Sequence, residues 1–256
     1  MNEVIQFNKC VESGELDKVE QALSQNPELA HTFTLQPREW GDEMWLPLHR
    51  AAFHGHVDIV ALLLSKGARP DSRTRFRTPF HARCTAMHFA AAGGYVDILS
   101  MLLKAGGDPN VINTENAAPL HWACRYGRGP ACELLLKSHA QLGTRDQDDR
   151  TPLHLAVLGD HAEVSGGDPD TVVPVLLEFG SNPNATCPRE PASFTPLHRC
   201  VTLGLDRLEC ARMLLKKGAD RTIRDPRWQK TPAELAADMV ASGDANMQAY
   251  VELLGG

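Results

Sequence analysis

A seven-residue motif recurs six times along this chain. Its fullest copy, residues 151–157, reads T-P-L-H-L-A-V, and residues 118–124 and 195–201 repeat it closely. Looser copies occupy residues 46–52, 85–91 and 231–237. Successive copies start 33 to 44 residues apart, and two of the steps equal 33. A motif with a nearly constant interval predicts similar units stacked in a row, because one unit alone cannot bury its apolar face.

Each copy of the motif has the pattern of a helix start. A threonine suits the capping position and a proline the first helical position. Leu153, Ala156 and Val157 then share one helix face. A second apolar segment follows most copies and ends in glycine, as at Gly67, Gly106 and Gly218. The pattern therefore predicts a pair of helices in each unit.

The T-P-L-H-x-A core, the base period of 33 and the Gly-Ala endings resemble the ankyrin-repeat family from about residue 8 to 254. The resemblance implies an all-α solenoid that forms a single domain over residues 1–256. It implies about seven helix-turn-helix repeats, including a cap at each end, at residues 1–34, 46–71, 85–117, 118–150, 151–194, 195–230 and 231–254. About eight extra residues, roughly 160–167, separate the helices of the fifth repeat.

Composition and motifs argue against several classes of protein. A formal net charge of −6 disfavours a general nucleic-acid binder, and no apolar run or signal-peptide pattern indicates a membrane or secreted protein. No phosphate-binding loop, nucleophile elbow or zinc-protease motif occurs, so we expect no enzyme and no cofactor. The seven cysteines are an odd number without a C-x-x-C pair, and four of them occupy predicted core positions of helices. They favour a reducing compartment, the cytoplasm or the nucleus, over the alternative of a disulfide framework. Cys84 and Cys187 lie in predicted loops and are the two cysteines with potential reactivity.

Histidine recurs in the motif, which invites a metal or catalytic interpretation. Stacked repeats would separate the five histidines by about 10 Å, too far for one metal ion whose bonds are about 2 Å long. We therefore predict no metal site, and the family resemblance implies that this histidine bonds to backbone between repeats. His54 and His56 lack further ligands at a zinc-like spacing and are predicted to face solvent. The motif histidines are His49, His88, His121, His154 and His198.

Helix phasing separates a core stripe from an open face. In the second repeat Leu48, Ala51 and Ala52 form the core stripe. Arg50, Phe53 and His54 share the other face of the same helix. The family resemblance implies that the first helices line a concave groove, where Trp, Tyr and Arg are the commonest binding hot spots. Packing against the next repeat is the alternative role, chiefly for Phe89, Leu155, Trp122 and Tyr126. The predicted groove residues are Arg50, Phe53, His54, Phe89, Trp122, Arg125, Tyr126, Leu158 and Arg199.

The loop after the second repeat is the most basic stretch of the chain. Five arginines lie between residues 69 and 83, interleaved with Phe76 and Phe80. The stretch suits a solvated loop, or recognition of an acidic or phosphorylated segment through Arg73, Arg75 and Arg77. Nucleic-acid binding is the third interpretation and the one that the acidic remainder of the chain disfavours.

The sequence thus predicts a monomeric protein-interaction module that captures a partner protein between its loops and its concave helices. A scaffold, regulatory or adaptor subunit of a larger complex is the alternative. The family resemblance also implies Asn110 as a site of side-chain hydroxylation, because it follows Asp108 by two residues and Leu102 by eight. Pro109 departs from the usual valine at the intervening position.

Overall fold

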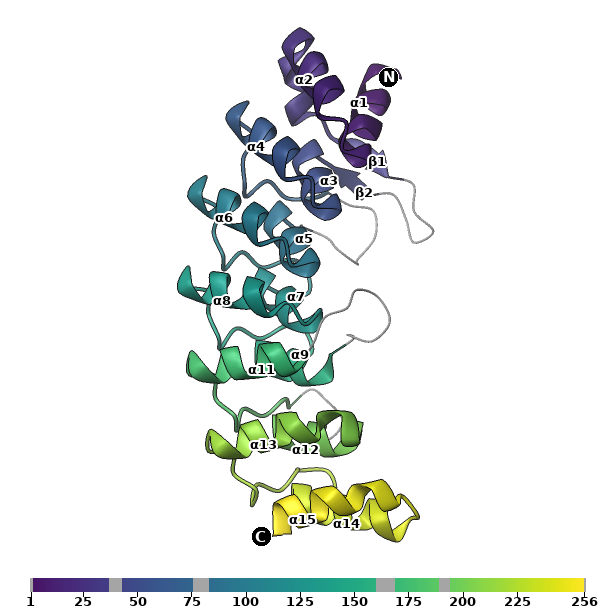
Figure 1. The fold of residues 1–256 in the computed structure, drawn as a ribbon, viewed down its shortest axis with the longest axis vertical. Helices are drawn as coiled ribbons and strands as arrows, with labels where there is room; N and C mark the ends of the chain where they lie inside the picture. Colours follow the sequence, from purple (N-terminus) through teal and green to yellow (C-terminus); the bar gives the residue numbers. More distant parts are fainter. Residues whose placement is uncertain (1, 37–42, 76–82, 160–168, 189–193, 256) are drawn as a thin grey trace. The chain divides into compact units, whose positions relative to one another are not determined.

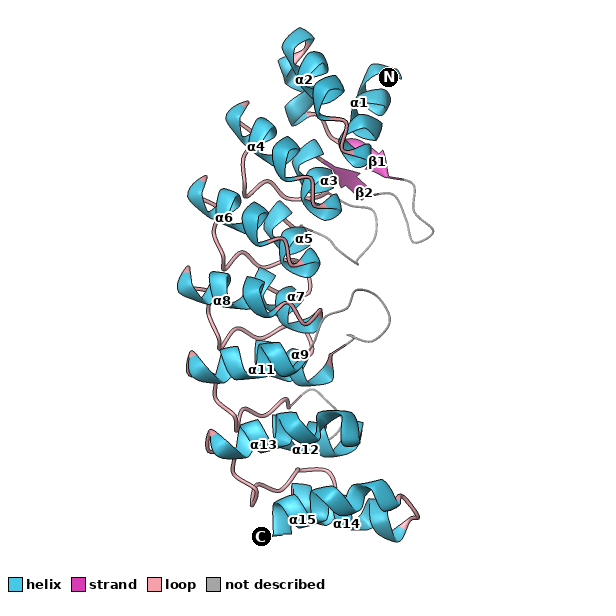
Figure 2. Cartoon of the chain, in the orientation of Figure 1, coloured by secondary structure: helices cyan, strands magenta, loops and turns pink. Residues whose placement is uncertain are grey.

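The computed structural model describes residues 2–36, 43–75, 83–159, 169–188 and 194–255. Within these residues the regular secondary structure is predominantly helical and includes seven consecutive pairs of α-helices (Figure 2). Its contacts divide it into two compact units, Met1–Ala123 with Leu134–Ala140, and Cys124–Glu133 with Gln141–Gly256. The border runs through one pair, α7 (Pro119–Arg125) and α8 (Gly129–Lys137).

The first unit begins with three complete pairs of helices, in two layers (Figure 1). In the layer of first helices, α3 packs against both α1 and α5. In the layer of second helices, α4 packs against both α2 and α6. The helices are α1 (Asn2–Ser13), α2 (Leu16–Gln25), the 3-10 helix η1 (Pro27–His31), α3 (Pro47–His54), α4 (Val57–Ser65), α5 (Ala86–Gly93) and α6 (Val96–Lys104).

The second unit repeats this arrangement. The first helix α12 packs against α9 and α14, and the second helix α13 packs against α11 and α15. Each unit is therefore a two-layered stack, as the sequence predicts. The helices are α9 (Pro152–Leu158), α11 (Pro169–Glu178), α12 (Pro196–Leu203), η2 (Leu205–Arg207), α13 (Leu208–Lys216), α14 (Pro232–Ala241), η3 (Ala245–Met247) and α15 (Gln248–Gly255).

The motif prolines mark the helix starts. Five of the six motif helices begin at the proline, and α5, whose motif has no proline, begins at Ala86. The hydroxyl of Thr195 accepts the amide of His198 at 3.4 Å, and that of Thr231 accepts the amide of Glu234 at 3.3 Å. The predicted core stripe is buried: Ala51 and Ala52 have no exposed surface. Such small residues let neighbouring helices approach closely.

A short two-stranded sheet is a feature that the sequence does not predict. Strand β1 (Thr34–Gln36) pairs antiparallel with β2 (Glu43–Trp45). Met44 of β2 then exchanges backbone hydrogen bonds with Arg75, at 3.0 and 3.1 Å. The loop that follows α4 is thereby attached to the loop that precedes α3.

Candidate binding surface and arginine-lined pocket

Four of the five motif histidines join two successive repeats through backbone groups. The Nδ1 atoms of His49 and His88 accept the amides of Leu46 and Thr85, at 3.0 and 3.1 Å, which closes the first turn of the helix. Nε2 then donates to a carbonyl that precedes the next repeat. The acceptors are Ser72 for His49 (2.8 Å), Ala117 for His88 (3.0 Å), Phe194 for His154 (3.3 Å) and Lys230 for His198 (3.2 Å).

These bonds require the neutral imidazole, since Nδ1 must remain an acceptor. Burial lowers the pKa of His49 and His154 to about 4 and that of His88 to about 3. Burial also lowers the pKa of His198. The predicted structural role of the motif histidine is therefore confirmed for these four positions. Among the described residues, no group of His, Cys, Asp or Glu is arranged to hold a metal ion.

Four aromatic rings cluster in the first unit: Trp45 at the end of β2, and Phe53, Phe89 and Trp122 on three successive first helices. Trp45, of which 1% is exposed, lies 4.5 Å from Phe89 and 5.4 Å from Phe53 between ring centroids. Phe89 also packs edge-on against Trp122, at 5.9 Å. Phe89 and Trp122 are only 3% and 9% exposed, so the helix phasing is wrong in placing them on an open surface. Phe89 and Trp122 instead have the alternative role, packing against neighbouring repeats. Phe53 is 40% exposed, as the phasing predicts.

Arg50 also departs from its predicted position. Its side chain is 3% exposed and forms an ion pair with Glu12 of α1. Nη2 donates to the hydroxyl of Thr34 at 2.8 Å. A buried guanidinium needs such partners, because desolvation of a single charge is expensive. Arg50 therefore connects α3 with α1 and β1.

The remaining predicted groove residues differ in exposure. His54 and Arg125 are exposed, and Tyr126, Leu158 and Arg199 are intermediate. Arg199 lies over the ring of Phe194, 5.2 Å from its centroid, and partial burial lowers its guanidinium pKa. His56 does not simply face solvent, because its Nε2 donates to the carbonyl of Glu12 at 2.8 Å.

The two loop cysteines are buried rather than reactive. Neither Cys84 nor Cys187 has exposed surface. Burial raises the pKa of the Cys187 thiol to about 11, which leaves it protonated at neutral pH. The thiol donates to the carbonyl of Asp148 at 3.2 Å.

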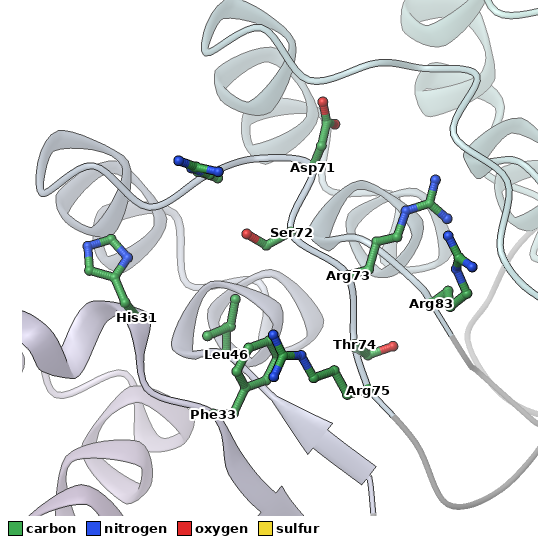
Figure 3. A pocket seen from close by; sticks show the side chains of 10 residues that line it. His31, Phe33, Leu46, Asp71, Ser72, Arg73, Thr74, Arg75 and Arg83 are labelled. Carbon is green, nitrogen blue, oxygen red and sulfur yellow. The ribbon is translucent and has the colours of Figure 1, made fainter.

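An open pocket of about 570 Å³ lies beside the basic loop (Figure 3). Its described lining includes a guanidinium from each of four arginines. We call it the arginine-lined pocket; its residues are His31, Phe33, Leu46, Arg69, Asp71, Ser72, Arg73, Thr74, Arg75 and Arg83. Arg77, together with Phe76 and Phe80, lies outside the described residues, as does the predicted insertion at 160–167.

Only part of this pocket could be found from the sequence. The arginines form a visible basic stretch. His31, Phe33 and Leu46 precede Arg69 by more than twenty residues. No motif marks His31 or Phe33, and the motif copy that begins at Leu46 gives no sign of a pocket. The pairing of Met44 with Arg75 brings the two segments together.

The sequence of these stacked helix pairs matches known family models. A model described as "Ankyrin repeats (3 copies)" matches residues 74–146 and 120–225, and one described as "Ankyrin repeat" matches residues 45–75. The chain belongs to the ankyrin-repeat family. Ankyrin repeats are generally protein-interaction modules, and their fold is typically non-catalytic. No helix in the described part of the ankyrin-repeat chain is long and apolar enough to cross a membrane.

Two mouse proteins and one human structure illustrate the similarity of this ankyrin-repeat chain. It is 46% identical to "Ankyrin repeat and SOCS box protein 10" from Mus musculus over 42% of this chain and 22% of that protein. It is 31% identical to "NF-kappa-B inhibitor delta" from Mus musculus over 50% of this chain and 32% of that protein. The human ASB11 ankyrin repeat domain shares the fold, with a TM-score of 0.76 at 22% identity over 98% of this chain and 97% of that one. The match thus spans less than a third of either mouse relative.

Proposed function

We propose that this chain is a non-enzymatic module that binds a partner protein through the exposed side of its first helices and the adjoining loops. The family supports the general class, since ankyrin repeats generally bind other proteins. The proposed contact residues that remain accessible are Phe53, His54, Arg125, Tyr126, Leu158 and Arg199. We propose a monomer that acts in the cytoplasm or the nucleus and carries no cofactor.

The exposed ring of Phe53 carries this proposal. Phe53 packs edge-on against Trp45 and Phe89, at 5.4 and 5.9 Å, and yet remains 40% exposed. Its buried neighbours hold the ring in one place, so binding would cost little side-chain entropy. Rigid aromatic rings of this kind are frequent anchors of protein interfaces.

Replacing Phe53 by serine is expected to lower recovery of the principal partner by on the order of tenfold, because one interface anchor typically contributes more than about 1.4 kcal/mol. Affinity purification from the native cell, followed by quantitative mass spectrometry, measures this. Phe179→Ser is the matched control, since Phe179 is 39% exposed and follows the second helix α11. Equal recovery with both variants would contradict a binding role for Phe53, provided that circular dichroism shows both to be folded.

A scaffold, regulatory or adaptor role in a larger complex is the second candidate. The observation that favours it is the similarity to proteins whose names combine ankyrin repeats with a SOCS box or describe an inhibitor. Both candidates require protein binding. They differ in whether the partner's activity changes on binding, which an activity assay of the purified partner can measure.

We also propose Asn110 as a site of side-chain hydroxylation. Its Nδ2 donates to the carbonyl of His139 at 3.1 Å, and its backbone amide donates to Asp108 at 2.8 Å. Peptide mass spectrometry of the native protein is expected to show the mass of one added oxygen atom on residues 108–112. Asn184, whose Nδ2 makes the equivalent bond to Gly218, serves as the comparison, because Asn182 replaces the preceding aspartate. An unmodified 108–112 peptide from cells that contain the hydroxylase would contradict the proposal.

A further inference from the structure

We propose that the arginine-lined pocket binds a phosphorylated side chain of a partner protein, with an apolar neighbour of that side chain against Phe33 and Leu46. The proposal rests on the protein-binding function proposed above and assigns a chemical class to the partner segment. Four observations carry it: the charge of the pocket, the fixed backbone beneath it, the geometry of its donors, and its size.

The pocket concentrates positive charge. Arg69, Arg73, Arg75 and Arg83 line it, and Asp71 is the only carboxylate among the described lining residues. Oδ1 of Asp71 accepts a hydrogen bond from the backbone amide of Asp108 at 3.0 Å. One oxygen of this carboxylate is therefore already bonded to the backbone of the next repeat. Guanidinium groups that share a pocket repel one another in the absence of an anion, and a bound anion removes that cost.

The backbone that presents these arginines is held at successive residues. The carbonyl of Ser72 accepts from Nε2 of His49 at 2.8 Å. Thr74 is buried, and its amide donates to the carbonyl of Cys84 at 2.8 Å. Arg75 exchanges two backbone bonds with Met44. Arg73 and Arg75 therefore project from a fixed stretch of backbone, which reduces the entropy lost when a ligand binds.

Two of the side chains are also positioned by contacts of their own. The guanidinium of Arg75 lies over the ring of Phe33, 4.2 Å from its centroid. Nη1 of Arg73 donates to the carbonyl of Ile112 at 2.8 Å, which leaves its other N–H groups for a ligand. In Figure 3 the labelled side chains of Arg73 and Arg83 end on the same side of the pocket, and Arg75 covers Phe33.

A phosphate monoester fits these donors better than a carboxylate does. It carries a charge of about −1.5 to −2 and three strong acceptor oxygens, and guanidinium forks bind such oxygens in pairs. Several arginines can then share one group. Nucleic acid is disfavoured because its phosphates follow an extended basic track, whereas this charge is local and the chain has a net charge of −6.

The size and walls of the pocket indicate a peptide segment rather than a free ion. Its volume of about 570 Å³ lies within the range of small-molecule sites, roughly 300–1,000 Å³. One phosphate leaves room for flanking groups. Phe33 and Leu46 provide apolar surface for a neighbouring side chain.

Fluorescence anisotropy with degenerate peptide libraries tests the proposal. The probes are fluorescein-labelled libraries of equal length whose central residue is phosphothreonine, threonine or glutamate. We expect the phosphothreonine library to bind the full chain at least about tenfold more tightly than the threonine library, with glutamate between them. Excess phenyl phosphate is expected to displace it.

The variant Arg75→Gln/Arg83→Gln should reduce phosphothreonine-library binding by about tenfold or more, because it removes two of the four guanidinium groups. The backbone bonds between Arg75 and Met44 do not involve the side chain and are kept. Arg75→Lys/Arg83→Lys should recover only part of the loss, since lysine retains the charge but not the fork. The control Arg212→Gln/Arg227→Gln removes the same charge from exposed positions of the second unit and should bind as wild type.

Three outcomes would overturn the proposal. The first is that the phosphothreonine and threonine libraries bind equally tightly, or that neither binds. The second is that the control variant loses as much affinity as the pocket variant. The third is that a single-stranded oligonucleotide binds and needs Arg75 and Arg83, while the phosphothreonine library does not bind. Each leaves the Phe53-dependent capture of a partner intact, so failure of the pocket and failure of the binding module are distinguishable.

Discussion

Acidification from about pH 7 to pH 5 is expected to destabilise the fold by several kcal/mol. The folded pKa of His49 and His154 is about 4 and that of His88 about 3, against an ordinary value of 6.5. The unfolded chain therefore binds protons below pH 6.5 that the fold does not bind. Stability is fully present above pH 6.5 and is lost as the pH falls toward 4.

The size of this effect follows from the linkage of protonation to folding. Each such histidine costs about 1.4 kcal/mol per pH unit within that window. Three of them amount to roughly 6 kcal/mol at pH 5, a large part of the roughly 5–15 kcal/mol typical of a folded domain. Urea unfolding at pH 7, 6 and 5, followed by circular dichroism, measures the change.

His88→Gln separates this cause from a general effect of acid. Glutamine cannot take up the proton, so the variant should start less stable at pH 7 but lose about 1.4 kcal/mol less per pH unit than wild type. A urea midpoint that is the same at pH 7 and pH 5 in the wild type would contradict the argument.

Trp45→Ala is expected to cost about 3–5 kcal/mol, the usual loss for a large aromatic residue in a core. Trp45 is 1% exposed and packs against Phe89 and Phe53, so its removal leaves a cavity between α3 and α5 and frees the ring of Phe53. Urea unfolding at neutral pH measures the free energy.

Trp228→Ala is the matched control. Trp228 is 47% exposed and contacts Phe194 at 5.6 Å between ring centroids. We expect its removal to cost about 1 kcal/mol or less. A loss of only about 1 kcal/mol or less for Trp45→Ala as well would show that burial of Trp45 does not stabilise the first unit.

The fold could be predicted from the sequence because each repeat encodes its own local structure. Threonine, proline and histidine of the motif specify a helix start within four residues, and the recurrence of the motif then specifies the stack. The sheet of β1 and β2 could not be predicted in this way, because its strands have three residues each and are held by long-range pairing with Arg75.

The binding surface was only partly predictable for a related reason. Helix periodicity tells which residues share a face but not what covers that face. Arg50 is covered by Glu12 and Thr34, and Phe89 by Trp45, all from segments without a motif. The arginine-lined pocket has the same origin, since its apolar wall comes from residues well upstream of the arginines.

The histidine bonds between repeats have a consequence for how such a chain can change in evolution. Each acceptor that Nε2 finds, from Ser72 to Lys230, is a backbone carbonyl, so the junction requires no particular side chain from the following repeat. Glu234, at the histidine position of the last motif, closes the first turn by accepting the amide of Thr231 at 2.8 Å. Closing the first turn of the helix and bonding to the following repeat are thus separate tasks, and Glu234 performs the first of them without a histidine ring. A repeat joined in this way can be duplicated, deleted or replaced while its junction is remade by the same two atoms, the histidine Nε2 and a backbone carbonyl oxygen, which leaves the loops free to diversify toward new partners.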